Sequence, residues 1–315
     1  MEKIKLGISS CLLGEKVRYD GGHKLDHFLA DTLGNYVTWV PVCPEVESGL
    51  PVPREAMHLV GDPKAPRLVT IRTGIDHTSR MKRWANSKVA ALKREELCGF
   101  VFKSRSPSSG MRGVKIYTEL GMPYATGSGI FAHAFMRGFP LLPMEDEGRL
   151  HDPAIRQNFI ERIFVFKRWQ EFKNGGGTAG ALVSFHTEHK LLMMSHSQKH
   201  YGVLGKIVAG AKKAKRDALH QQYITTLMDG LSLPTTVKKN TNVLQHMAGY
   251  FKAQLSRDEK QELQEVIEQY RRELVPLIVP VTLLKHFVRK YNVDYLKRQY
   301  YLSPHPAELM LRNHV

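Results

Sequence analysis

The first hundred residues alternate short apolar runs with segments of helical spacing. The apolar runs are rich in β-branched and aromatic residues and cover residues 4–9, 36–43, 68–72 and 99–103. The spacing of apolar side chains predicts helices over residues 24–34 and 78–96. Strands that alternate with helices predict an α/β domain over residues 1–150, built on a mostly parallel sheet with flanking helices.

Three of the predicted strands end in residues that carry chemistry. Cys11 follows the first strand, Cys43 ends the second, and a Ser-Pro-Ser-Ser-Gly turn over residues 106–110 follows the last. In open α/β sheets, ligands bind in the crevice beyond the carboxyl ends of the strands. We therefore expect these three separated segments to surround one pocket.

The chain has only three cysteines, and the third is Cys98. A low, odd number argues against a disulfide framework and leaves a metal site, a reactive thiol or plain buried residues. Cys43 stands two positions before Glu45, a pair that can combine a soft metal ligand with a carboxylate base. Cys98 begins the strand whose far end carries the turn, about 17 Å away at ~3.3 Å per residue. We expect Cys98 to be structural.

The rest of the chain has helical spacing. A helix is predicted from Pro153, a favoured first helical residue, to about residue 172, and a glycine-rich linker follows over residues 173–178. The further predicted helices cover residues 180–201, 203–229, 238–254, 256–273 and 280–290. We expect a connecting helix and linker over residues 151–178 and an all-α domain over residues 179–315.

The formal net charge is +16, and it is unevenly distributed. From Lys173 onward there are 21 basic and 11 acidic residues, which is a surplus of ten in the shorter half. Such a surplus favours a polyanionic partner, above all nucleic acid, over a merely solvated surface. The candidate phosphate contacts are Lys212, Lys213, Lys215, Arg216, Lys238, Lys239, Lys252 and Arg312.

Several other classes of protein are disfavoured. No run of 18 apolar residues exists, so no transmembrane helix is expected, and the N-terminus is too polar for a signal peptide. We expect a cytoplasmic protein without a membrane partner, and no protein partner is indicated. The glycine turn over residues 127–129 lacks the full dinucleotide fingerprint.

Six motifs occur in order along the first 145 residues. They are Ile8-Ser-Ser-Cys-Leu-Leu-Gly14, Val17-Arg-Tyr-Asp-Gly21, Cys43-Pro-Glu45, Gly49-Leu-Pro-Val-Pro-Arg54, Phe102-Lys-Ser-Arg-Ser-Pro-Ser-Ser-Gly110 and Thr126-Gly-Ser-Gly-Ile-Phe131. This set resembles the thiouracil desulfurase (TudS) family. The roles of Asp20 and Arg54 within these motifs stay open.

The resemblance implies a [4Fe-4S] cluster held by three cysteines, with one iron left open to bind the sulfur of a thiocarbonyl. Carried over to this chain, Cys11 and Cys43 are cluster ligands. Glu45 is the base that activates water, and Ser106 hydrogen-bonds or protonates the substrate.

One position departs from the family pattern. The family has Ser-Pro-Ser-Cys-Gly at the turn, whereas the fourth residue here is Ser109. A serine hydroxyl is a harder and poorer ligand than a thiolate, so cluster affinity should fall. Ser109 is then a weak natural ligand, an engineered replacement, or a sign that the chain has lost the chemistry and kept RNA binding.

The C-terminal half resembles the YbgA-like helical domain. The matching stretches are residues 189–190, 242–252, 295–299 and 309–313. The fused pair resembles a family of desulfidases that convert 4-thiouridine in transfer RNA to uridine, which implies a thiolated transfer RNA as partner. Two alternatives are a desulfurase of free thiouracil-type bases and an RNA-binding protein whose catalysis is impaired at Ser109.

Overall fold

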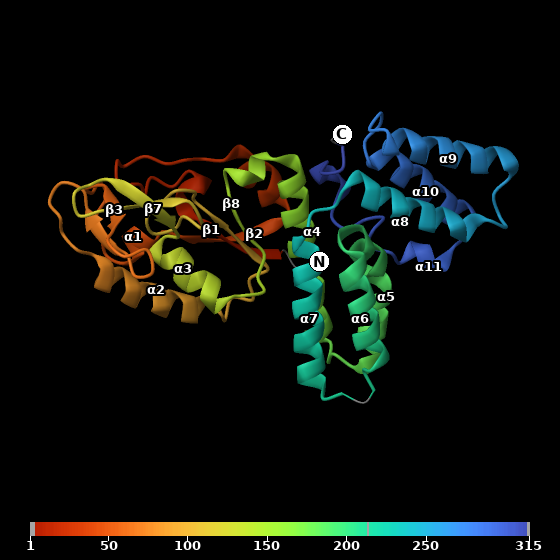
Figure 1. Ribbon diagram of the computed structural model, residues 1–315, viewed down its shortest axis with the longest axis horizontal. Coiled ribbons are helices and arrows are strands. Elements are labelled where there is room, and N and C mark those ends of the chain that lie inside the picture. The colour runs from red at the N-terminus through yellow and green to blue at the C-terminus, as the bar shows by residue number, and fades with distance from the viewer. Residues whose placement is uncertain (1–3, 213, 314–315) are drawn as a thin grey trace. The chain divides into compact units, whose positions relative to one another are not determined.

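The computed structural model describes residues 4–212 and 214–313. Contacts divide the chain into two units, Met1–Asp152 and Pro153–Val315 (Figure 1). The α/β class of the first and the all-helical class of the second were both predicted. None of the described helices is both long and apolar enough to cross a membrane.

The first unit is organised around a four-stranded parallel sheet. Its order is β2 (Val37–Val42), β1 (Ile4–Ser9), β5 (Gly99–Phe102) and β8 (Met144–Asp146). The central strand β5 is buried along its whole length, as a parallel strand covered on both faces must be. All four strands point the same way, so the segments that follow them emerge at one edge of the sheet.

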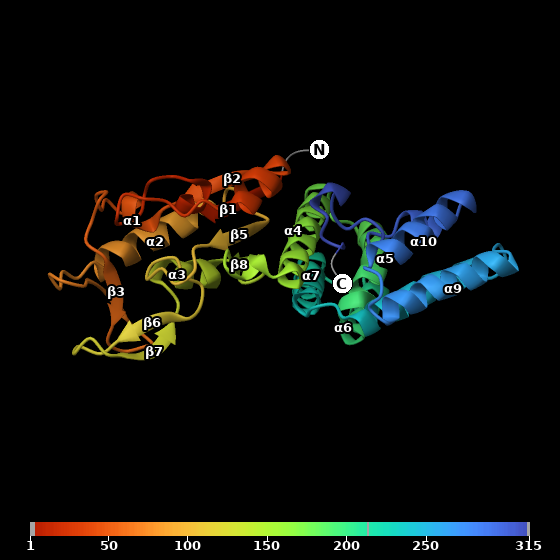
Figure 2. The same ribbon diagram turned by 90° about the horizontal axis from the view of Figure 1, so that it is seen from above.

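A second sheet in this unit was not predicted, and Figure 2 shows it apart from the first. Its order is β4 (Arg67–Thr70), β3 (Met57–Val60), β6 (Val114–Tyr117) and β7 (Pro123–Gly127). The β3–β4 and β6–β7 pairs are antiparallel, whereas β3 and β6 are parallel. Only residues 68–72 were expected to be a strand here, and the observed strand ends two residues earlier.

Two helices pack side by side in the first unit, α2 (Thr78–Leu92) and α3 (Ile130–Gly138). Helix α3 contributes Phe131 and Phe135 to an aromatic cluster with Phe100 and Phe102 of β5. The predicted helix over residues 24–34 is wrong in kind. The chain there forms a π-helical turn, Phe28–Thr32, and a 3-10 turn, Leu33–Asn35.

The second unit contains the remaining long helices. They are α4 (Pro153–Asn174), α5 (Ala179–His196), α6 (Gln198–Ala209), α7 (Arg216–Ser232), α8 (Val237–Ala248), α9 (Arg257–Arg271) and α10 (Ile278–Lys290), followed by the short α11 (Asp294–Lys297). Helix α4, for which a connecting role was expected, packs against α5 and α7 of this unit.

Two of the predicted helical stretches are interrupted. Ser197 ends α5 and its side chain accepts the N–H of His200, so a new helix begins inside the predicted stretch 180–201. The stretch 203–229 is not one helix, because α6 ends at Ala209 and α7 begins at Arg216. The Ser256–Glu259 capping box is present at the start of α9, as its sequence pattern predicts.

Candidate active site

A cavity of about 940 Å³ opens at the carboxyl edge of the parallel sheet. Its lining includes Cys11, Cys43, Glu45, Ser106 and Ser109, so the structure brings together all five predicted catalytic and metal-binding residues. They come from the segments after β1, β2 and β5, as the parallel topology requires. The roles assigned to these residues remain predictions.

Cys11 lies in the 3-10 turn Ser10–Leu13 directly after β1. Its carbonyl accepts the N–H of Gly14, which adopts φ +89°, and the N–H of Lys24 at 2.8 Å. Burial raises the pKa of the Cys11 thiol to about 11, although Lys103 and Arg18 act in the opposite direction. Without a metal the thiol is therefore protonated at neutral pH, and binding of a metal must release that proton.

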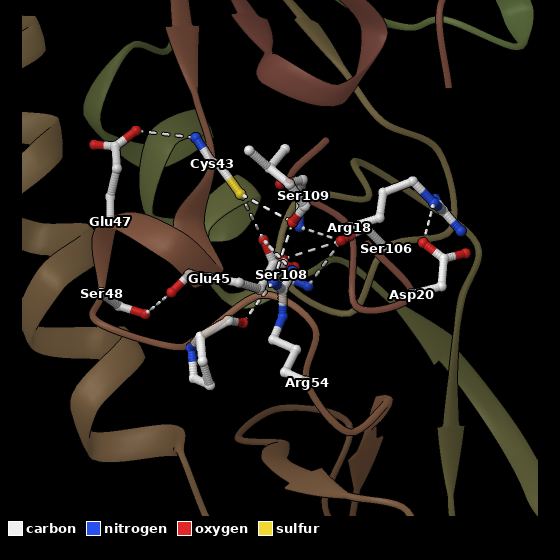
Figure 3. A network of polar contacts seen from close by, with 12 residues as sticks. Arg18, Asp20, Cys43, Glu45, Glu47, Ser48, Arg54, Ser106, Ser108 and Ser109 are labelled. Atoms are coloured by element: carbon white, nitrogen blue, oxygen red, sulfur yellow. Dashed lines mark hydrogen bonds and ion pairs between the residues drawn. The ribbon is translucent and has the colours of Figure 1, made fainter. Parts of the chain in front are cut away.

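Cys43 is the N-cap residue of α1 (Pro44–Glu47), at the end of β2. Its N–H donates to Oε1 of Glu47 at 2.9 Å, and Glu47 in turn pairs with Lys88 at 2.8 Å. Its Sγ lies 3.6 Å from Oε2 of Glu45 (Figure 3). Burial, with the charge of Glu45, raises the pKa of the Cys43 thiol to about 12.

Arg54 fixes the position of the Glu45 carboxylate. Its side chain is only 8% exposed and lies 3.8 Å from Oε2 of Glu45, while it donates to the carbonyls of Val17 and Pro51. Asp20 does not line the cavity; it accepts the N–H of Gly22 and pairs with Arg18, which orders the turn next to the cavity.

The Ser-Pro-Ser-Ser-Gly segment forms a compact turn that contributes Ser106, Pro107 and Ser109 to the cavity wall. Oγ of Ser106 accepts the N–H of Ser109 at 3.1 Å, and the carbonyl of Ser106 accepts the N–H of Gly110 at 2.8 Å. A Cβ at Gly110 would lie 2.7 Å from that carbonyl, so only glycine fits there. Ser109 is 3% exposed and lines the cavity.

Ser108 was missed by the sequence analysis. It is fully buried and does not line the cavity, but its hydroxyl donates to Oε1 of Glu45 and lies 3.0 Å from Oγ of Ser106. Figure 3 shows it between these two residues. Only its place two residues after Ser106 in the turn could have drawn attention to it.

Cations outnumber acids in the cavity wall. The basic lining residues are Arg18, Lys24, Arg54, Lys103, Arg105, Arg112 and Arg149, and the acidic ones are Glu45 and Asp146. Several of these cations are paired; Lys103, for example, contacts Glu147. The surplus of positive charge suits an anionic occupant. Cys98 is buried and is not among the lining residues, as expected for a structural cysteine.

Comparison with known proteins covers both units. Residues 6–147 match the 2-thiouracil desulfurase family model, and residues 190–306 match the model described as protein of unknown function DUF1722. Protein YbgA of Escherichia coli K12 is 35% identical over 153 residues, which are 48% of this chain and 90% of YbgA. The chain belongs to the YbgA family. Its first unit is a domain of the 2-thiouracil desulfurase family.

Two further proteins are each similar to part of the chain. Protein YbbK of Bacillus subtilis 168 is 28% identical over 130 residues, covering 40% of this chain and 85% of YbbK. A solved structure named as the [4Fe-4S]-dependent thiouracil desulfidase TudS is 30% identical. It covers 48% of this chain and 95% of its own, with a TM-score of 0.39.

The basic residues of the YbgA-like unit are not all at the surface. Lys212, Lys215 and Arg216 are exposed. Lys212 and Lys215 lie outside α6 and α7, and Arg216 is the first residue of α7, so these cations do not share one helix as predicted. Lys213 lies outside the described residues. Lys238 and Lys239 stand in the first turn of α8, where the exposed Lys238 lies beside Lys239, which donates to the carbonyl of Pro234.

Lys252 is exposed, but Arg312 is not available as a phosphate contact. Arg312 is 5% exposed, pairs with Glu161 at 3.0 Å and donates to the carbonyl of Tyr301. Its assignment to an RNA-binding surface is therefore wrong. A guanidinium that neutralises a buried carboxylate cannot turn outward without leaving that charge unpaired.

Proposed function

We propose that this chain is an iron–sulfur-dependent desulfidase that converts 4-thiouridine in transfer RNA to uridine. The observation that carries the proposal is one cavity, in a domain of the 2-thiouracil desulfurase family, that gathers two thiols, a carboxylate and the serine turn. Carbon–sulfur cleavage by water needs a soft group to accept sulfur and a base to activate the water.

The donors in the cavity fit a cluster with two strong ligands and one weak one. Cys11 and Cys43 would hold the cluster, and the hydroxyl of Ser109 would be its third ligand. No group of three or more His, Cys, Asp or Glu suited to a metal occurs in the described parts of the chain. When bound, the cluster would supply a Lewis-acidic iron that polarises the carbon–sulfur bond. The cationic wall offsets the negative charge of thiolates.

The chain's own residues supply the acid–base chemistry. Glu45 removes a proton from the water that attacks the thiocarbonyl carbon, and Arg54 keeps the carboxylate in place. Ser106 offers its hydroxyl oxygen to the substrate or the attacking water inside the cavity. The exposed Lys212, Lys215 and Arg216 would contact the phosphates of the RNA.

The decisive experiment measures iron and acid-labile sulfide per chain after anaerobic reconstitution, together with single-turnover release of sulfide. The unmodified chain and Ser109→Cys are each given 4-thiouridine-containing transfer RNA and free 2-thiouracil. We expect a cluster and turnover of the transfer RNA, with higher cluster occupancy in Ser109→Cys. A preference for free 2-thiouracil would favour the free-base alternative, and no turnover by either protein would overturn the proposal.

A second candidate function is RNA binding without catalysis, which Ser109 favours. It predicts that only Ser109→Cys holds a cluster and releases sulfide, while both proteins bind transfer RNA equally. Cluster content and RNA affinity, measured on the same samples, separate the two candidates.

A further inference from the structure

The hydroxyl of Ser108 occupies an unusual position for a serine beside a candidate catalytic carboxylate. It is fully buried and does not line the cavity, so it cannot touch a substrate. It nevertheless joins Oε1 of Glu45, 63 residues away along the chain, to Oγ of Ser106, which does line the cavity (Figure 3).

The direction of these hydrogen bonds follows from counting protons. A serine hydroxyl carries one hydrogen, and that of Ser108 is donated to the carboxylate of Glu45. The 3.0 Å bond between the two hydroxyls must therefore use the hydrogen of Ser106. The Ser106 hydroxyl therefore donates to Ser108, and the Ser108 hydroxyl donates to Glu45.

Oγ of Ser106 can also accept a proton from the cavity. It accepts the N–H of Ser109 at 3.1 Å and, at 3.3 Å, the N–H of Ser108. Because Oγ lines the cavity, a water bound there can replace the longer and weaker of these two bonds and donate to Oγ.

We infer that Ser108 is a positioning residue that relays a proton from a water bound at Ser106 to Glu45. The water O–H bond breaks and its proton joins Ser106, whose own proton passes to Ser108, whose proton passes to Oε1 of Glu45. Both hydroxyls are restored, the carboxylate becomes a carboxylic acid, and the water oxygen keeps the electron pair with which it attacks carbon. The inference rests on the proposed function, because it specifies how Glu45 acts as base.

The backbone holds the relay rigidly. The carbonyl of Ser108 accepts the N–H groups of Phe131 and Ala132 in the first turn of α3. A Cβ at Gly129 would lie 2.4 Å from the carbonyl carbon of Ser108, so glycine permits this close approach. A relay needs such fixed geometry, because a small misplacement of hydrogen-bonded groups slows proton transfer strongly.

The test compares Ser108→Ala, Ser106→Ala and the double variant in single-turnover sulfide release from 4-thiouridine-containing transfer RNA. Ser48→Ala is the matched control, because Ser48 donates to the main-chain carbonyl of Glu45 and does not line the cavity. We expect Ser108→Ala to lower the rate about 100-fold with unchanged KM and iron content, and Ser48→Ala to leave the rate unchanged. The double variant should be no slower than the slower single variant, because Ser108→Ala and Ser106→Ala each interrupt the same proton pathway.

Two further readouts separate a relay from a structural role. Rates in mixtures of light and heavy water should depend on deuterium content along a curve in the unmodified chain, since several protons move, and along a line in Ser108→Ala. Ser108→Ala as fast as Ser48→Ala, or an additive double variant, would overturn the relay.

The hydrogen bond itself is tested without turnover. A buried hydroxyl that donates to a carboxylate gives a downfield, slowly exchanging proton resonance. We expect this signal in the unmodified chain and Ser106→Ala, and not in Ser108→Ala or Glu45→Gln. Its survival in Ser108→Ala would overturn the relay even if the chain releases no sulfide. If the resonance appears and disappears in these variants as expected but no sulfide is released, the proposed function is refuted and the hydrogen bond from Ser108 to Glu45 stands.

Discussion

Glu45 has a separate partner for each of its carboxylate oxygens. Oε1 accepts the hydroxyl of Ser108, and Oε2 lies near Arg54 and the thiol of Cys43. We expect Glu45→Ala to lower sulfide release at least about 100-fold, because general base catalysis is lost. Affinity for transfer RNA, measured by filter binding, should not change, since the exposed basic residues are untouched. Turnover at the full rate would show that another group is the base.

Glu161 on α4 is a buried carboxylate with a histidine and an arginine as partners. It lies 3.2 Å from Nε2 of His196 and 3.0 Å from Arg312. Nδ1 of His196 lies 2.8 Å from the carbonyl oxygen of Leu233. Burial raises the pKa of Glu161, but the hydrogen bond from His196 and the charge of Arg312 outweigh it. The net effect holds the pKa well below its usual range.

This depressed pKa predicts an acid-sensitive second unit. A folded-state pKa below the unfolded value, about 4.3, contributes stability above that value, which is lost as the pH falls toward the folded pKa. We expect Glu161→Gln to lower the free energy of unfolding by about 3–5 kcal/mol at pH 7, since it leaves the buried guanidinium of Arg312 without its carboxylate partner. The acid dependence should also become flatter.

Hydrogen exchange of the amides in α4–α10, followed from pH 7 down to pH 3, measures this effect in the full chain. Glu262→Gln is the control, because Glu262 is exposed on α9. Equal acid sensitivity in the two variants would show that the pair of Glu161 with His196 and Arg312 does not supply the stability.

Only those residues of the candidate site that follow a recognisable local pattern could be predicted from the sequence. Cys11, Cys43 and Ser106 follow predicted strands, so topology alone places them together. Ser108 depends on a contact with a residue 63 positions away, which no local pattern reveals. Arg312 looked exposed because charged residues usually are, but its partner Glu161 is 151 positions away.

At the scale of the elements, the packing of β1 against β5 depends on the close approach of Gly7 to the ring of Phe100. A Cβ at Gly7 would lie 2.2 Å from Cδ2 of the buried Phe100 on the neighbouring β5. We expect Gly7→Ala to destabilise the first unit by about 1–3 kcal/mol and to lower iron content, because it shifts β1 and the Cys11 turn against β5.

Gly180→Ala is the matched control, since Gly180 lies in α5 and a Cβ there meets nothing within 4 Å. It should leave iron content unchanged and, if anything, stabilise the helix. Chemical denaturation and iron analysis of the two variants check both statements. Full iron content in Gly7→Ala would show that the packing of Gly7 against Phe100 does not affect the cluster site.

Continuous apolar runs predicted the strands of the parallel sheet better than those of the second sheet. Strands β1, β2 and β5 are apolar runs whose pattern is unambiguous. The strands of the second sheet have four or five residues that mix polar with apolar side chains, so they give a weaker pattern. Strand β8 has three residues, two of them acidic, and is a strand only because β5 pairs with it.

At the scale of the whole molecule, the proposed RNA contacts lie outside the desulfurase domain. We expect replacement of Lys212, Lys215 and Arg216 by Ala to weaken transfer RNA binding. The plot of log affinity against log salt should become shallower by about 0.7–0.9 per lost phosphate contact. Affinity measured between low and physiological salt checks this.

The control for this variant replaces Arg257, Lys260 and Arg272, three exposed cations on or next to α9, by Ala. It removes the same charge from a different surface, so a specific contact predicts an unchanged salt slope in the control. The same change of slope in both variants would show that Lys212, Lys215 and Arg216 act only through net charge and make no specific contact with the RNA.

The hydrogen bonds between the serine turn, residues 106–110, and the start of α3 have a consequence for heat resistance and for redesign. Gly129 closes onto Gly110, and the first turn of α3 holds Ser108 while Phe131 enters the aromatic core. The turn therefore loosens only when the core melts, so inactivation and unfolding should occur at one temperature. An engineer who seeks a new substrate should leave this turn alone and vary the mouth of the cavity, where Lys24 and Arg105 stand exposed.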